Sequence, residues 1–166
     1  SVSVASAASA CEGVTLNVLF PQPHQGAAET LSADFAAATG ATINPTIVPY
    51  DEVAAKATLD AQSGANTFDV VDTFYINVGA LAEDGVLADL TDWIESDDNL
   101  DPEDFIASVY DPYSLNNGRR FGLPFDGDTH VLFYNTEILE RNGITAPPAT
   151  WDEYLQDVKT ITENEK

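Results

Sequence analysis

Short apolar segments alternate with amphipathic segments through the first half of the chain. The segment 15–20 is apolar, rich in β-forming residues and bounded by Gly13 and Pro21, which predicts a strand. A helix is expected to follow, because Leu31 and Phe35 share one face and Gly40 is a suitable stop. The later elements predicted in this half are an extended segment at 43–50, a helix from Asp51 to before Gly64, a strand at 68–71 and a helix at 77–84. This alternation predicts an α/β fold with a mainly parallel sheet flanked by helices.

The second half predicts shorter elements. Asp101, Pro102 and Glu103 have the order of an N-cap, a first helical position and an early acid, so a helix is expected through about Tyr110. The remaining predictions are a hairpin turn at 116–118, strands at 121–125 and 131–134, a helix at 137–142, and a capping box at Thr150 and Glu153 that opens a helix over 151–163. No strand follows this last helix, so we expect a fragment or a chain completed by another polypeptide.

Charge narrows the range of partners. The 166 residues contain 28 acids and 6 bases, giving a formal net charge of −22. Nucleic acids and anionic membrane surfaces are poor partners for such a chain, because both attract clustered Lys and Arg. No run of about 18 apolar residues is present to span a bilayer. An acidic excess is common in proteins that work in salty or extracellular fluid.

The N-terminus resembles the end of a secretion signal. Residues 1–10 are Ser, Ala and Val, and Ala8-Ser9-Ala10 precedes Cys11. Small residues at these positions suit signal peptidase, and a lipobox whose Cys11 becomes a lipid anchor is an alternative, although Ala8 stands where Leu is usual. A flexible arm over residues 1–12 is the third interpretation. Cys11 is the only cysteine, so no disulfide can form within the chain.

Catalytic and cofactor motifs are absent from the sequence. His24 and His130 are the only histidines, and neither lies in a nucleophile elbow. Glycine-rich phosphate loops are missing, and the Cys and His content is too small for a zinc site. The acidic loop from Asp97 has Pro102 where a calcium loop requires Gly. We therefore expect no catalytic residue, no metal and no cofactor.

Asp126 and Asp128 are the one candidate pair of catalytic carboxylates. A glycosidase uses two such groups about 5 to 10 Å apart across a sugar. Asp-Gly-Asp is also a common turn. A third interpretation is that both carboxylates accept hydrogen bonds from ligand hydroxyls or an ammonium group, without a reaction.

Polar and aromatic residues follow two of the predicted strands. His24 and Gln25 come after the first strand, while Asp72, Phe74 and Tyr75 come after the strand at 68–71. Ligands of open α/β sheets bind beyond the carboxyl ends of the strands. A sugar offers an apolar face to an aromatic ring and hydroxyls to Asp, Gln and His. These residues are therefore candidates for a ligand site, although the two rings could equally cover the sheet.

The order of segments resembles a known family. The matching residues are 15–20; 68–71 followed by Gly79 and 84–90; 121–124; Phe133-Tyr134-Asn135 with the helix after it; and Pro147-Pro148-Ala149-Thr150-Trp151-Asp152-Glu153. Together they resemble the extracellular solute-binding proteins of ABC importers, in family 1, which includes maltose-binding protein. The resemblance covers about residues 13–166, and Tyr-Asn with Pro-Pro-x-Thr-Trp-Asp-Glu is its most specific part.

The resemblance implies a periplasmic-binding-protein-like (type II) lobe over 13–123 and the incomplete start of a second lobe over 124–166. It implies extracytoplasmic capture of a solute, without catalysis, and its delivery to the membrane subunits of an ABC permease. A sugar or oligosaccharide is the first expected ligand, and a polyamine or other cation the second. The expected ligand-binding residues are His24, Gln25, Asp72, Phe74, Tyr75, Asp126 and Asp128. A secreted glycoside hydrolase using Asp126 and Asp128, or a cell-surface domain without a ligand, are the alternatives.

Overall fold

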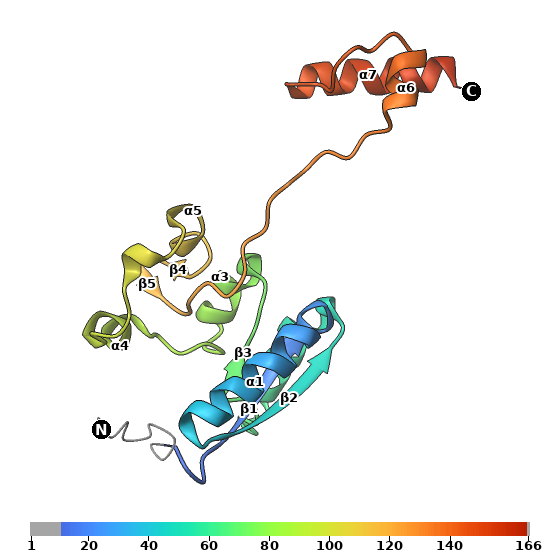
Figure 1. Ribbon diagram of the computed structural model, residues 1–166. Coiled ribbons are helices and arrows are strands. Elements are labelled where there is room, and N and C mark those ends of the chain that lie inside the picture. Colours follow the sequence, from blue (N-terminus) through green and yellow to red (C-terminus); the bar gives the residue numbers. More distant parts are fainter. Residues whose placement is uncertain (1–10, 166) are drawn as a thin grey trace, which may run out of the picture. The chain divides into compact units, whose positions relative to one another are not determined.

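The computed structural model describes residues 11–165. The chain divides into two compact units, the first ending at Gly127 and the second beginning at Asp128. The lobe assignments 13–123 and 124–166 stay predictions. In chain order the elements of the first unit are β1 (Thr15–Pro21), η2 (Gln22–His24), α1 (Gln25–Thr39), β2 (Thr42–Val48), η3 (Tyr50–Glu52), α2 (Val53–Gln62), β3 (Val70–Val71), α3 (Tyr75–Glu83), α4 (Thr91–Ser96), η4 (Pro102–Asp104), α5 (Ala107–Tyr110), β4 (Leu115–Asn116) and β5 (Arg119–Arg120). Figure 1 labels the strands and most of the α-helices.

The first unit contains a three-stranded parallel sheet in the order β2-β1-β3 (Figure 1). β1 and β2 pair along their whole length, from Thr15 opposite Thr42 to Pro21 opposite Val48. β3 pairs with β1 through two residues, Val70 opposite Val18 and Val71 opposite Leu19. The predicted α/β class with a parallel sheet is confirmed. Right-handed crossovers leave β1 toward β2 and return from β2 toward β3, so α1 and α2 cover opposite faces of the sheet.

The core of this unit centres on Leu19 in the middle strand. Leu19 is 0% exposed, and it lies in one apolar cluster with Val53 and Ala57 of α2. Val48, Phe68, Val71 and Val86 pack against the cluster. α2 presents Val53 and Ala57 on one face because residues four apart on a helix are neighbours. The small Ala57 brings the helix close to the sheet.

Several predicted element boundaries were wrong. Asp51 does not cap a helix, because it lies in the 3-10 turn η3 and α2 begins two residues later, at Val53. The helix expected over 101–110 is interrupted: the carboxylate of Asp101 accepts from the amide of Glu103 at 3.0 Å, but Phe105 is extended (φ −78°, ψ 147°). The cap therefore starts only the 3-10 turn η4.

The strands predicted at 121–125 and 131–134 are absent from the described structure. A strand needs a neighbour that accepts and donates ladder hydrogen bonds. None of the strands described between residues 11 and 165 pairs with either segment. Phe133 is 90% exposed as a result, so an apolar pattern alone was not sufficient to make a strand.

The predicted hairpin turn at 116–118 is confirmed by β4 and β5. Asn117 and Gly118 both have positive φ, at 51° and 76°, as a tight two-residue hairpin requires. The turn presents Arg119, which forms ion pairs with Asp89 and Asp92. The hydrogen bond from Arg119 lowers the pKa of the Asp89 carboxyl to about 2. This ion pair links the hairpin to the start of α4.

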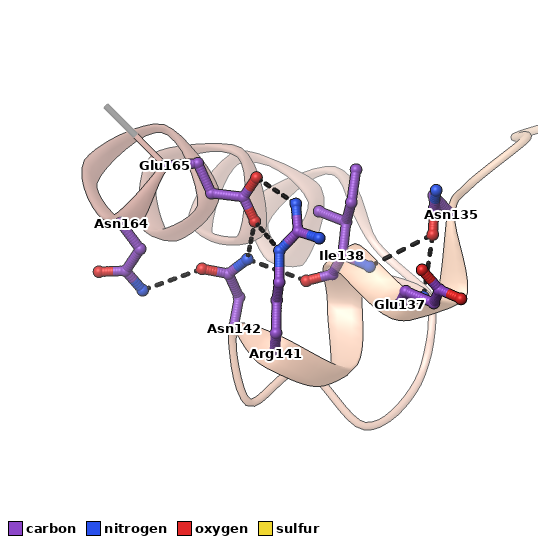
Figure 2. A network of polar contacts seen from close by, with 7 residues as sticks. All are labelled: Asn135, Glu137, Ile138, Arg141, Asn142, Asn164 and Glu165. Carbon is purple, nitrogen blue, oxygen red and sulfur yellow. Dashed lines mark hydrogen bonds and ion pairs between the residues drawn. The ribbon is translucent and has the colours of Figure 1, made fainter.

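The second unit contains two helices, α6 (Thr136–Arg141) and α7 (Trp151–Asn164). The predicted capping box of α7 is confirmed, because the Thr150 hydroxyl accepts from the Glu153 amide and the Glu153 carboxylate accepts from the Thr150 amide, both at 3.2 Å. Figure 2 shows how the ends of the helices are joined: Glu165 accepts from Arg141 and from the Asn142 amide group, the latter at 2.7 Å. The bidentate Arg141 contact lowers the pKa of Glu165.

Candidate functional site

The carboxyl ends of β1 and β3 place polar side chains from distant segments together. β1 ends at Pro21 and leads through η2 to His24, while β3 ends at Val71 and leads to Asp72. The two strands are hydrogen-bonded neighbours that run in the same direction, so the residues after them emerge at the same edge of the sheet. His24 Nδ1 lies 2.6 Å from Asp72 Oδ2.

Asp126 reaches the same histidine from the end of the first unit. Its Oδ2 lies 3.4 Å from His24 Nε2, so one imidazole ring lies between two carboxylates. The Phe125 ring meets the His24 ring edge-on, with 5.5 Å between centroids. Asp72 is largely buried, with 13% of its side chain exposed, whereas 58% of the Asp126 side chain is exposed.

Partial burial by itself lowers the pKa of His24, because the protein interior disfavours the charged ring. The hydrogen bond and negative charge of Asp72 act in the opposite direction, and Asp126 adds to them. The carboxylates prevail, so the pKa of His24 is raised above its ordinary 6.5. A protonated His24 is therefore the form that this site favours.

Four aromatic rings of the first unit form a row that includes Phe74, two residues after Asp72. Tyr50 and Phe74 have centroids 5.4 Å apart, Phe74 and Tyr75 meet edge-on at 4.6 Å, and Tyr75 stacks on Tyr113 at 4.5 Å with 10° between planes. Phe74 directly precedes α3, and Tyr75 is its first residue. The row joins three segments of the first unit: the turn at Tyr50, the start of α3 and the turn at Tyr113.

The structure brings together three of the seven predicted ligand-binding residues, His24, Asp72 and Asp126. Phe74 and Tyr75 contact each other in the aromatic row. Gln25 begins α1, and its amide donates to Glu29 at 2.9 Å. Asp128 is the first residue of the second unit, whereas the other six predicted residues belong to the first unit. The binding role of all seven stays a prediction.

Sequence reasoning missed Tyr50, Tyr113 and Phe125. Tyr50 could have been found, because it follows the carboxyl end of β2, where the rule that selected His24 and Asp72 also applies. Tyr113 lies in a turn after α5 and reaches Tyr75 only through tertiary packing, for which the sequence offers no signal. Phe125 precedes Asp126 and was assigned to a strand that did not form.

A hollow of about 680 Å³ lies elsewhere in the first unit. It is lined by residues of α4, the acidic loop after it and the β4–β5 hairpin, including Glu95, Asp97 and Arg120. Its lining shares no residue with the carboxyl ends of β1 and β3. Arg120 is already engaged by Asp111, the Tyr110 carbonyl and the Tyr110 ring, so this hollow offers few groups for a ligand.

Residues 11–165 contain neither a group of metal-ligating side chains nor a helix suited to span a membrane. Over that range, no three His, Cys, Asp or Glu side chains are grouped as metal ligands. None of the helices in the described part of the chain is long and apolar enough to cross a membrane.

Residues 1–10, with the predicted signal-peptidase motif, lie outside the described residues. Cys11 is partly exposed, and its amide donates to the Thr39 carbonyl at 3.1 Å.

The parallel α/β fold of this chain is that of the type II periplasmic-binding proteins to which it is similar among solved structures. The sequence profile of the family described as bacterial extracellular solute-binding protein matches residues 21–166. The chain belongs to this family, a family of transporter binding proteins, as the sequence resemblance predicted.

Individual relatives agree with this assignment. The chain is 30% identical over 140 residues to a probable amino-acid ABC transporter periplasmic-binding protein of Sinorhizobium fredii, covering 81% of this chain and 32% of the relative. It is 32% identical to the diacetylchitobiose-binding protein DasA of Streptomyces coelicolor, covering 80% and 30%. An ABC transporter solute-binding protein of Agrobacterium radiobacter in complex with ribitol is 27% identical, with a TM-score of 0.74 and coverage of 82% and 35%. The chain thus spans about a third of each relative.

Proposed function

We propose that this protein captures a neutral polyhydroxylated solute, a sugar or sugar alcohol, and delivers it to the membrane subunits of an ABC permease. The observation that supports it best is the meeting of Asp72 and Asp126 at His24, beyond the carboxyl ends of β1 and β3, with Phe74 of the aromatic row two residues after Asp72. Hydroxyl groups donate to carboxylates, and the C–H face of a sugar or polyol packs on an aromatic ring.

The charge of the site favours a neutral ligand over a cation. Below the raised pKa of His24, its protonated ring offsets one of the two negative charges of Asp72 and Asp126. One net negative charge then remains on the two carboxylates. Solvent screens this charge, because more than half of the Asp126 side chain is exposed. A polyamine, which carries several positive charges, is therefore the second candidate.

Relatives support the same solute class. The related structure from Agrobacterium radiobacter holds ribitol, and the Streptomyces coelicolor relative is named for diacetylchitobiose. The Sinorhizobium fredii relative is named as a probable amino-acid transporter protein, so an amino acid belongs in the ligand panel. We infer a polyhydroxylated ligand because ribitol and diacetylchitobiose, named for two of these three relatives, are compounds that carboxylates and aromatic rings can bind.

The proposed mechanism is reversible capture without chemistry. In this account the ligand binds at the edge of the first unit, favours a closed state of the hinge between lobes, and the permease recognises that state. The binding role of Asp128, in the second unit, stays a prediction. A glycoside hydrolase that uses Asp126 and Asp128 is the less favoured alternative, because Asp126 is already paired with His24. We also propose that the protein is exported from the cytoplasm and that a lipid on Cys11 anchors it to the membrane.

A ligand screen tests this function. The complete polypeptide, including any residues that follow Lys166, is titrated calorimetrically with ribitol, diacetylchitobiose, maltose, spermidine and a set of amino acids. We expect one polyhydroxylated compound to bind reversibly with a Kd near or below about 1 μM, equivalent to about −8 kcal/mol. The recovered compound should be chemically unchanged. Selective binding of spermidine, or release of a cleaved sugar, would reject the proposal.

A further inference from the structure

His24 joins three segments of the first unit. The ring follows β1, Asp72 follows β3, and Asp126 belongs to the segment 121–127 that continues from β5 to the end of the unit. The contacts are 2.6 Å from Nδ1 to Asp72 and 3.4 Å from Nε2 to Asp126, and the Phe125 ring packs on the imidazole edge. Both ring nitrogens are therefore directed at carboxylates that come from separate parts of the chain.

The two contacts require different protonation states of the ring. An imidazolium has two N–H donors, whereas a neutral imidazole has one donor and one acceptor. The Asp72 contact is the shorter and the less exposed, so a neutral His24 keeps its proton on Nδ1. Nε2 would then present a lone pair to the Asp126 carboxylate, and two acceptors repel each other. Loss of one proton therefore removes the Asp126 contact selectively.

Few other charged groups act on the ring. Asp72 faces it from the segment after β3, and Asp126 from the segment after β5. Glu29, on the helix that His24 precedes, is engaged by the Gln25 amide. His24 lies at the N-terminal end of α1, where the helix dipole favours anions, so the carboxylates on either side gain from this position. The same dipole disfavours a positive ring, and the two flanking carboxylates outweigh it and the effect of burial, since the pKa of His24 is raised.

We propose that His24 is a positioning residue whose doubly protonated ring ties Asp126 to Asp72 and so holds residues 125–127 against the carboxyl end of the sheet. Its nitrogens are occupied by the carboxylates, so it orients the ligand-binding groups instead of contacting the ligand. Loss of the proton frees Asp126 and loosens the segment that immediately precedes the second unit. The tie itself needs no ligand, and only its effect on affinity rests on the proposed function.

The direction of the pH dependence follows from the raised pKa of His24. A group whose pKa is higher in the folded state stabilises that state fully below its ordinary value of 6.5. That contribution is lost as the pH rises through the raised value. Residues 125–127 are therefore held below pH 6.5 and are released as the pH rises through the raised pKa of His24.

Ring-nitrogen NMR of the ligand-free full chain tests this tie. Long-range ¹H–¹⁵N correlations should show both nitrogens of His24 protonated at pH 6, with a titration midpoint above 6.5. The heteronuclear NOE of Phe125, Asp126 and Gly127 should fall with the same midpoint. Asp126→Asn should lower the midpoint and remove the pH dependence of the NOE, Asp126→Glu should retain both, and His130→Gln should change neither.

Two results would overturn the proposal. One is a His24 midpoint at or below 6.5 in the unmodified chain. The other is an NOE over residues 125–127 that stays constant while His24 titrates. Because no ligand is present, these outcomes are independent of whether ribitol or any other solute binds.

Discussion

Leu19→Ala is expected to lower the free energy of unfolding of the first unit by about 2–5 kcal/mol, the range for truncating a fully buried Leu. Leu19 is 0% exposed in the central strand and packs against Val53 and Ala57. The substitution removes apolar contacts and leaves a cavity that the paired strands β2 and β3 prevent from collapsing. Because domains are stable by only about 5–15 kcal/mol, this loss is a large fraction of the total.

Urea unfolding followed by far-UV circular dichroism measures this loss. Leu59→Ala is the matched control, because Leu59 lies on α2 but is 69% exposed, and its effect should stay within about 0.5 kcal/mol apart from the change in helix propensity. If Leu19→Ala does not fold, Leu19→Met keeps the volume and should lose less than about 1.5 kcal/mol. Equal effects of Leu19→Ala and Leu59→Ala would contradict the assignment of the core.

Asp72→Asn is expected to weaken ligand binding about 10- to 100-fold, since a hydrogen bond to a charged group contributes about 1.5–3 kcal/mol. The substitution keeps the size of the side chain and removes its negative charge. Asp72 is the less exposed of the two carboxylates at His24, so solvent competes least with its hydrogen bonds to a ligand.

Calorimetric titration with the compound selected by the screen measures this change. Asp34→Asn, an exposed position on α1, removes the same charge away from the site and should leave the affinity within about twofold, as expected for a screened surface charge. The urea midpoint of each variant shows whether the fold is intact. An Asp72→Asn protein that is folded and binds as tightly as the unmodified protein would remove Asp72 from the site.

The sequence predicted the sheet well because its local signals agree with the tertiary structure. The apolar run at β1 and the stop at Gly40 specify the same βαβ unit. The apolar face predicted for α1 was wrong, because Leu31 and Phe35 are 47% and 44% exposed and Ala28 is the buried residue of this helix. The capping box at Thr150 and the turn at Asn117 were predictable for the same reason: their hydrogen bonds and dihedral angles involve only neighbouring residues.

Predictions failed where the outcome depends on distant partners. The segment 131–134 has a strand pattern, yet within the part of the chain described here it has no neighbouring strand. The carboxyl-edge rule selected His24 and Asp72 correctly as neighbours, but the sequence could not show that Asp126 would reach the other nitrogen of the same ring. Tyr113 joins the aromatic row through packing that no local pattern encodes.

Chemical-shift mapping tests most directly whether the carboxyl ends of β1 and β3 form the ligand site. The compound that binds in the screen is added to the ¹⁵N-labelled complete polypeptide, and the perturbed backbone amides are identified. The largest changes in the first unit are expected at Asp72, Phe74 and Tyr75. Changes confined to the hollow lined by Glu95, Asp97 and Arg120 would show that the ligand binds elsewhere and would contradict the account.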